Sequence, residues 1–279
     1  MSDAALPIPP AGPAGGATGQ ARGVGGFLGV RTRVIHALIL REMQTRFGRH
    51  NLGFAWLFFE PLFLGVMVGL MHSVTDKGVI GGVDPFYFSV MGYVPFFMFR
   101  TIVGRSAAAL HANLTLLFHR QVTPLDIVLA RNILEGVAVL GVVLLIIAVA
   151  SWVTESLPHD PSLVVVALLM SFLLANGLSM CVAGLTARWE GLERLVHPIT
   201  YLMLPISGAF FAVAQMPPEW RELLVWSPLV HPHEAIREGI FGPRIPSYAD
   251  FGYLSLWILG TNLLGVAALR GARRKLTIF

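Results

Sequence analysis

Ionisable side chains inside apolar stretches are the residues of this sequence most able to do chemistry. Glu60, Arg100 and Arg105 each stand in a run that is otherwise almost entirely apolar. A charge in the hydrocarbon core of a bilayer is expensive, so it is usually paired or functional. Counting from the run ends at about 1.5 Å per residue puts Glu60 and Arg100 at similar depths. We therefore predict that these two form an ion pair, with direct ligand contact as the alternative.

Residue sets that could support catalysis within this chain are weak. His231 and His233 flank a proline and Glu234 follows, but proline restricts the geometry of metal ligands, so no metal site is predicted. Glu60 and Glu135 are acids within the apolar runs, and they lie far apart in sequence. Metal-dependent group transfer would need clustered acids. A membrane-embedded glycan or lipid transferase is therefore the weaker interpretation.

The sequence also lacks a nucleotide-binding loop. Such a loop needs Gly-Lys-Ser/Thr, so that backbone N–H groups and a lysine can cradle phosphates. The lysines of this chain are Lys77 and Lys275, and neither follows a glycine. ATP and Mg²⁺ would therefore bind to a partner, and no cofactor is expected in this chain. The single cysteine, Cys181, can form no internal disulfide.

The composition indicates a membrane protein. The chain has 279 residues, of which 55% are hydrophobic and 13% charged, whereas soluble domains carry about 25% charge. Nucleic-acid binding is excluded, because the basic residues flank apolar runs instead of forming one face. Since a span needs about 20 apolar residues, we predict an all-α integral membrane protein with six transmembrane helices, at residues 52–72, 86–109, 127–153, 162–187, 195–214 and 251–270.

The distribution of basic residues gives the spans a direction. With both termini in the cytoplasm, most of the 20 lysines and arginines flank the inner ends of the predicted spans. The inverted arrangement would put them outside, against the positive-inside rule. The sequence therefore predicts a multi-pass membrane protein with both termini cytoplasmic.

The part before the first span divides in two. Residues 1–26 are rich in Pro, Gly and Ala and lack the apolar core of a signal peptide, so they read as a disordered cytoplasmic tail. Residues 27–279 then form one transmembrane domain. Within 31–50, Ile35, Ile39 and Met43 repeat every four residues, opposite Arg41. This pattern predicts an amphipathic helix in the membrane interface, with its basic side chains in water or among head groups; a cytoplasmic extension of the first span is the alternative.

Residues 215–250 form the unusual segment before the last predicted span. Pro218 and Pro232 each precede a short run with early acidic residues, which favours a helix start. Both runs are too short to cross a bilayer. We predict two short re-entrant or periplasmic helices, because such backbone is tolerated only beside protein or a water-filled path.

Three stretches carry a resemblance to a known family. They are REMQTRFGR with LGFAW and EPL in residues 41–62, QVTPLD in 121–126, and SPLVH with E and REG in 227–239. In this order they resemble capsular polysaccharide export permeases, the transmembrane subunits of ABC-2 type exporters. The resemblance implies a location in the inner, cytoplasmic membrane of a bacterium, a homodimer with two cytoplasmic ATPase subunits and a lipid-linked polysaccharide substrate, and it allows periplasmic and outer-membrane partners. O-antigen, teichoic-acid and small-molecule exporters stay open, as does a membrane scaffold or receptor.

The resemblance and the predicted topology suggest roles for particular residues. The loop after the second span would dock on the ATPase as a coupling helix, with an ordinary solvated connector as the alternative; its candidate residues are His111, Asn113, His119, Arg120 and Gln121. Arginine can bind an anionic glycan or linker, although Arg105 could instead reach lipid head groups. Aromatic rings can stack on sugars, although any one ring could instead face lipid or pack between helices. These candidates are Arg105, Trp56, Phe59, Tyr93 and Phe97. A periplasmic gate would comprise Trp220, Arg221, His231, Glu234 and Arg237.

Overall fold

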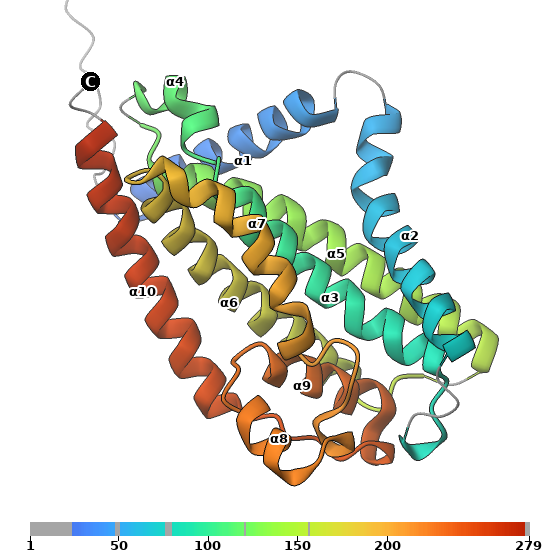
Figure 1. Cartoon of the computed structure of the whole chain (residues 1–279). Helices are drawn as coiled ribbons and strands as arrows, with labels where there is room; N and C mark the ends of the chain where they lie inside the picture. The colour runs from blue at the N-terminus through green and yellow to red at the C-terminus, as the bar shows by residue number, and fades with distance from the viewer. Residues whose placement is uncertain (1–23, 48–50, 76–79, 120, 156, 277–279) are drawn as a thin grey trace, which may run out of the picture.

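The computed structural model describes residues 24–47, 51–75, 80–119, 121–155 and 157–276 (Figure 1). The predicted tail up to residue 23 and the candidate coupling residue Arg120 lie outside these ranges. Every regular element in the described residues is helical, which confirms the predicted all-α class. The α-helices are α1 (Val24–Phe47), α2 (Asn51–Thr75), α3 (Pro85–Ser106), α4 (Leu114–Leu117), α5 (Pro124–Thr154), α6 (Pro161–Thr186), α7 (Glu193–Leu202), α8 (Pro218–Leu224), α9 (Val230–Phe241) and α10 (Phe251–Leu276).

Five of the described helices are long and apolar enough to cross a membrane: α2, α3, α5, α6 and α10. Three of them begin at a proline behind a side-chain cap. Asp84 caps α3, Thr123 forms a capping box with Asp126 at the start of α5, and Asp160 caps α6. These caps satisfy backbone N–H groups that have no partner within the helix, so local sequence fixes where these spans start.

The fifth predicted span, residues 195–214, is not one continuous helix. α7 ends at Leu202, a 3-10 turn covers Leu204–Ile206, and Gly208 adopts a φ of 78°. Pro205 has no N–H to donate and its ring crowds the preceding turn, while Gly208 supplies a backbone conformation that other residues avoid. Figure 1 nevertheless shows α7 and the following turns carrying the chain from the end near α4 to the end that holds α8 and α9.

The bundle has two distinct ends (Figure 1). α1 crosses one end and packs against α5, and α4 and the end of α10 lie at the same end. α8 and α9 lie at the opposite end, where α9 packs against α6 and α3. The expected helix before the first span exists, but it begins at Val24, seven positions before the predicted start, and this extension includes Gly25, Gly26 and Gly29.

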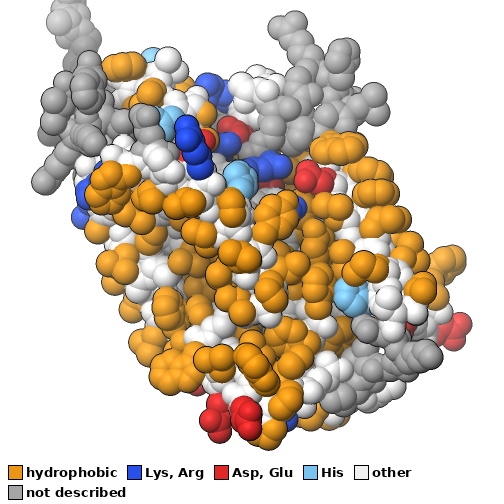
Figure 2. Space-filling model, viewed as in Figure 1, with side chains coloured by type: hydrophobic (Ala, Val, Ile, Leu, Met, Phe, Trp, Pro, Cys, Tyr) orange, Lys and Arg blue, Asp and Glu red, His pale blue; other side chains and the backbone are white. Residues whose placement is uncertain are grey.

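α3 is the buried centre of the bundle and contacts α2, α5, α6 and α7. Gly65 and Gly69 let α2 approach it closely, since a Cβ on Gly65 would lie 2.7 Å from Val94 and one on Gly69 2.6 Å from Val90. This small-residue step therefore serves contact within the subunit. Figure 2 shows a mostly hydrophobic face between two ends that carry the charged side chains, the surface expected of a membrane protein.

Candidate functional site

Arg105 is the centre of an ion cluster near the end of α3 that faces α1. Its Nη1 donates to Oε1 of Glu135 at 2.6 Å, and its Nη2 lies 3.9 Å from Oε2 of Glu60. The side chains of Arg105 and Glu60 are 34% and 31% exposed, whereas that of Glu135 is 4% exposed. Arg105 thus holds carboxylates of α2 and α5 instead of reaching for lipid head groups.

The structure does not bring Glu60 and Arg100 together, so the predicted pair is wrong in this conformation. Arg100 donates from Nη1 to the Tyr201 hydroxyl at 2.6 Å and lies 4.9 Å from the centre of that ring. Counting along a helix gives the depth of a residue and not the face it occupies. Positions five apart are rotated by about 140° on a helix of 3.6 residues per turn, so Arg105 faces α2 and α5 while Arg100 faces α7.

The four candidate aromatic residues fall into two groups. Trp56 and Phe59 are exposed on α2, with ring centres 5.2 Å apart. Tyr93 and Phe97 are buried, at 8% and 2% exposure. The structure corrects their expected role, because rings packed in the core offer no face to a glycan. Only the α2 pair is accessible to a ligand or to another chain.

The candidate coupling residues also divide by exposure. His119 and Gln121 are exposed and, with Arg41, line a cavity of about 630 Å³ between α1 and the segment after α4. Asn113 is buried: its Oδ1 accepts from Arg41 Nη1 at 2.7 Å and its Nδ2 donates to the Ala109 carbonyl at 2.9 Å. His111 is half-buried. Asn113 therefore ties the loop to α1, which leaves His119 and Gln121 as the accessible pair.

Several polar side chains of α1 pair with the bundle. Arg31 Nη1 lies 2.8 Å from Asp126 Oδ1, and Glu42 Oε1 lies 3.1 Å from Arg131 Nε. Together with the Arg41 bond to Asn113, these contacts correct the expectation of water or head-group contact for Arg31 and Arg41, whereas Arg33 is exposed as expected. No periodic pattern in the sequence indicates these pairs, because each partner lies on a distant element.

The candidate gate residues are mostly interior. His231, Glu234 and Arg237 are at most 2% exposed. Glu234 Oε1 accepts from the Val213 backbone N–H at 3.1 Å and from Arg237 at 3.4 Å, and its Oε2 accepts from the Tyr248 N–H at 3.3 Å. A buried charge survives when it is paired and hydrogen-bonded, so this pair holds the loops on both sides of α8 and α9.

Close backbone packing completes that cluster. Arg237 Nη2 donates to the Ala209 carbonyl at 2.8 Å, and its guanidinium lies 4.3 Å from the centre of the Phe88 ring. A Cβ on Gly92 of α3 would collide with the same Ala209 carbonyl. Only glycine at this position allows the loop after α7 to reach α3. The irregular segment after α7 therefore packs directly against α3.

The remaining gate candidates differ from that cluster. Arg221 is half-buried and donates to the carbonyls of Ala214 and Met216 at 3.2 and 3.3 Å. Trp220 is 59% exposed. Of the five predicted gate residues, Trp220 is the one whose side chain stands largely clear of the protein, as a surface anchor would.

Comparisons with known proteins show the family of this chain. Residues 33–241, which reach from α1 to the end of α9, match the family model described as ABC-2 type transporter. This chain is a member of that family. The match covers the half-exposed ion cluster, the α1 cavity and the buried gate residues, so all of these belong to the family domain.

Three relatives of this ABC-2 transporter protein align over most of its length. It is 34% identical over 243 residues to "Capsule polysaccharide export inner-membrane protein CtrC" of Neisseria meningitidis, covering 86% of this chain and 91% of the relative. It is 31% identical over 246 residues to "Capsule polysaccharide export inner-membrane protein BexB" of Haemophilus influenzae, with 87% and 92% covered. It is 30% identical over 246 residues to "Polysialic acid transport protein KpsM" of Escherichia coli, with 86% and 94% covered.

Two histidines of α9 in this ABC-2 transporter chain are buried beside the Glu234–Arg237 pair. His231 accepts from the Asp250 N–H at its Nδ1 and faces the Val225 carbonyl at 2.9 Å with its Nε2, so Nε2 carries the proton of a neutral ring. His233 donates from Nδ1 to the Leu229 carbonyl at 2.7 Å. Burial lowers the pKa of His233 to about 4, because desolvation penalises the charged form. In the described part of the chain, no three potential metal ligands gather.

Sequence reasoning missed a polar network inside the ABC-2 transporter domain. Asn132 of α5 donates to Asn176 Oδ1 at 2.8 Å and to Ser179 Oγ at 2.6 Å on α6, and Asn176 donates to Asn262 Oδ1 of α10 at 3.0 Å. Amides across neighbouring helices stabilise contacts in apolar surroundings. The signal was present, since each asparagine interrupts an apolar run, but sequence alone did not show which helices would meet.

Proposed function

We propose that this protein is the membrane channel subunit of an ATP-driven exporter that moves lipid-linked capsular polysaccharide out of the cytoplasm across the inner membrane. One observation carries the substrate class: the similarity to proteins named for capsule polysaccharide export and polysialic acid transport extends over 91–94% of their own lengths. Similarity limited to a shared domain would not cover so much of each relative's length. The long, apolar helices supply the membrane frame that such a subunit needs.

The proposed complex contains two copies of this chain and two cytoplasmic ATPase subunits, which would bind ATP and Mg²⁺. The cavity between α1 and the segment after α4 is the proposed docking site, because His119 and Gln121 are exposed there and Arg41 ties its two walls together through Asn113. Closure of the ATPases would then move α1 and this segment together. Ion pairs from α1 to α5 would pass that motion into the spans.

The proposed orientation puts both termini in the cytoplasm and α8 and α9 in the periplasm, where further export proteins could join. The described ends of α1 and α10 lie at one end of the bundle (Figure 1) and carry Arg31, Arg33, Arg270 and Arg273. That charge satisfies the positive-inside rule in this orientation only. The proposed glycan path passes the exposed rings of Trp56 and Phe59 and the cluster around Arg105, where rings can stack on sugars and a half-exposed guanidinium can meet an anionic group.

Reconstitution with the ATPase encoded beside this gene in the source bacterium tests the proposal. We expect the two proteins to co-purify, and His119→Ala with Gln121→Ala to weaken the complex while leaving the melting temperature of the isolated permease unchanged. Glu219→Gln with Glu222→Gln, on exposed positions of α8 at the other end, is the matched control. Capsule display in a deletion strain tests the substrate separately: a strain that still displays capsule would remove the glycan assignment and leave the transporter assignment standing.

A further inference from the structure

A second cavity lies at the end of the bundle that carries α8 and α9. Its volume is about 650 Å³, and its walls come from the turn before α3, the end of α5 with the loop to α6, and the turn after α9. Three candidate spans start or end beside it, at Pro85, Thr154 and Pro161. Span ends mark the boundary of the hydrocarbon core, so this cavity lies at the depth of lipid head groups.

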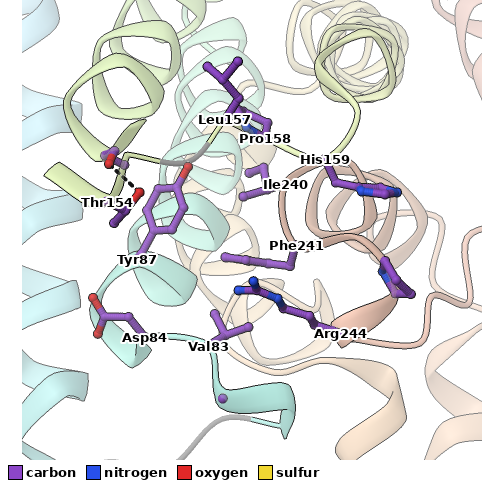
Figure 3. A pocket seen from close by; sticks show the side chains of 13 residues that line it. Val83, Asp84, Tyr87, Thr154, Leu157, Pro158, His159, Ile240, Phe241 and Arg244 are labelled. Atoms are coloured by element: carbon purple, nitrogen blue, oxygen red, sulfur yellow. Dashed lines mark hydrogen bonds between the residues drawn. The ribbon is translucent and has the colours of Figure 1, made fainter. Parts of the chain in front are cut away.

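Polar groups without protein partners line this cavity (Figure 3). Arg244 extends beneath Phe241 toward Val83, and Asp84 lies on the other side of Val83 in this view. Across the described residues, neither the Arg244 guanidinium nor the Tyr87 hydroxyl has a hydrogen-bond or ion-pair partner. Asp84 uses Oδ1 to accept from the Phe86 N–H at 3.1 Å, which leaves Oδ2 for a ligand.

Most of the remaining lining is apolar, with Thr154 and His159 as its other polar side chains. Val83, Leu157, Ile240 and Phe241 line the same cavity. The rings of Tyr87 and Phe241 pack edge to face on each other, with centres 5.5 Å apart and planes at 83°. A ligand that fits the lining carries an anion for Arg244, a cation for Asp84 and an apolar portion beside them.

We propose that the cavity binds the head group of a phospholipid bearing a phosphate and a primary ammonium, of the phosphatidylethanolamine type. Arg244 binds the phosphate, Asp84 accepts hydrogen bonds from the ammonium, and the Tyr87 hydroxyl donates to a phosphate or ester oxygen. The glycerol portion lies against the apolar lining. Such a lipid joins α3, α5 and the turn after α9, and so fixes the outer end of the bundle. This site does not depend on which molecule the protein exports.

Native mass spectrometry of the full chain tests the site. The protein is purified from nanodiscs that contain equal amounts of phosphatidylethanolamine, phosphatidylcholine and phosphatidylglycerol, and the retained lipid is identified. We expect retention of phosphatidylethanolamine above the other two, because the choline cation has no N–H to donate and the glycerol head group has no cation. Arg244→Gln and Asp84→Asn should each lower its retention about tenfold, the effect of losing one charge-assisted hydrogen bond.

Matched variants distinguish a loss of lipid binding from misfolding. Asparagine is as good a helix cap as aspartate, so Asp84→Asn keeps α3 capped while removing the carboxylate. Tyr87→Phe should give a smaller loss of retention. Arg270→Gln on exposed α10 and Glu219→Gln on α8 should retain lipid as the wild type does. Equal retention of the three lipids, a preference for phosphatidylglycerol, or equal losses in the control variants would overturn the assignment.

Discussion

The two ends of this ABC-2 transporter protein hold arginine–carboxylate clusters of the same chemistry in opposite surroundings. At the end that faces α1, Arg105 and Glu60 are about one third exposed and 3.9 Å apart. At the end that carries α9, Glu234 and Arg237 are 1% and 2% exposed, and backbone groups of two loops complete their hydrogen bonds. Burial therefore separates the Arg105–Glu60 contact, which can exchange partners while Arg105 keeps the buried Glu135, from a pair that cannot.

This difference in burial suggests that the two clusters have different roles. A half-exposed ion pair contributes little to stability, so its charges stay available to a moving helix or an anionic ligand. A buried pair is costly to break, since removing one member leaves an uncompensated charge. We therefore expect the buried gate candidates to stabilise the end that carries α9, and the ion cluster near α1 to lie at the end that an ATPase would drive.

The largest expected effect comes from the buried pair. Glu234→Gln leaves the Arg237 charge without its counter-ion and should destabilise the fold by about 3–5 kcal/mol. The melting temperature in detergent and the yield of monodisperse protein measure this loss. Glu238→Gln is the matched control, because Glu238 lies on the same helix and its side chain makes no hydrogen bond or ion pair with any described residue. Equal melting temperatures for Glu234→Gln and Glu238→Gln would contradict a stabilising role for the buried pair.

Acidification should weaken the same end. The pKa of His233 is about 4 in the fold, below its unfolded value of about 6.5. Between these values the unfolded chain binds more protons, so the stability from the neutral ring is complete above pH 6.5 and lost as the pH falls toward 4. The full difference corresponds to about 3–4 kcal/mol. The melting temperatures of the wild type and of His233→Asn should converge as the pH falls from 7 to 4. Parallel curves would show that His233 is not the source of this pH dependence.

The smallest effect on stability is expected at the half-exposed cluster. Glu60→Gln and Arg105→Gln should show a coupling of about 0.5–1 kcal/mol in a double-mutant cycle. Glu60→Gln and Arg100→Gln should be additive, since Arg100 bonds to Tyr201. Capsule display by cells carrying Glu60→Gln should nevertheless fall several-fold at normal permease levels. Coupling of Glu60 to Arg100 would restore the pairing that depth alone suggested.

The apolar runs predicted the span starts to within three residues, since α3, α5 and α6 begin at Pro85, Pro124 and Pro161, where 86, 127 and 162 were expected. A proline behind an acid or a hydroxyl marks where α3, α5 and α6 begin, and caps act over a few residues of sequence. The break after α7 was also encoded, in Pro205 and Gly208, but the apolarity of residues 195–214 outweighed it. Hydropathy reports whether a segment suits lipid and does not report whether it is continuous.

Sequence could not show which helix face meets which neighbour. Arg100 and Arg105 look alike in a linear run, and only the packing of α3 against α7 on one side and α2 with α5 on the other separates their partners. The same limit hid the burial of Tyr93 and Phe97. His231 and Glu234 looked like gate or metal residues because their backbone partners, Val213, Tyr248 and Asp250, are distant in sequence or carry no signal in their side chains.

Accessibility labelling tests the assignment of the two ends most directly. Cys181 is the single cysteine of the chain, so a Cys181→Ser background allows His119→Cys and Trp220→Cys to be read one at a time, both at exposed positions. In intact cells, a membrane-impermeant maleimide should label the cysteine at position 220 and leave that at 119 unlabelled until the membrane is opened. Labelling at 119 with protection at 220 would contradict a transporter whose α1 end faces the cytoplasmic ATPase.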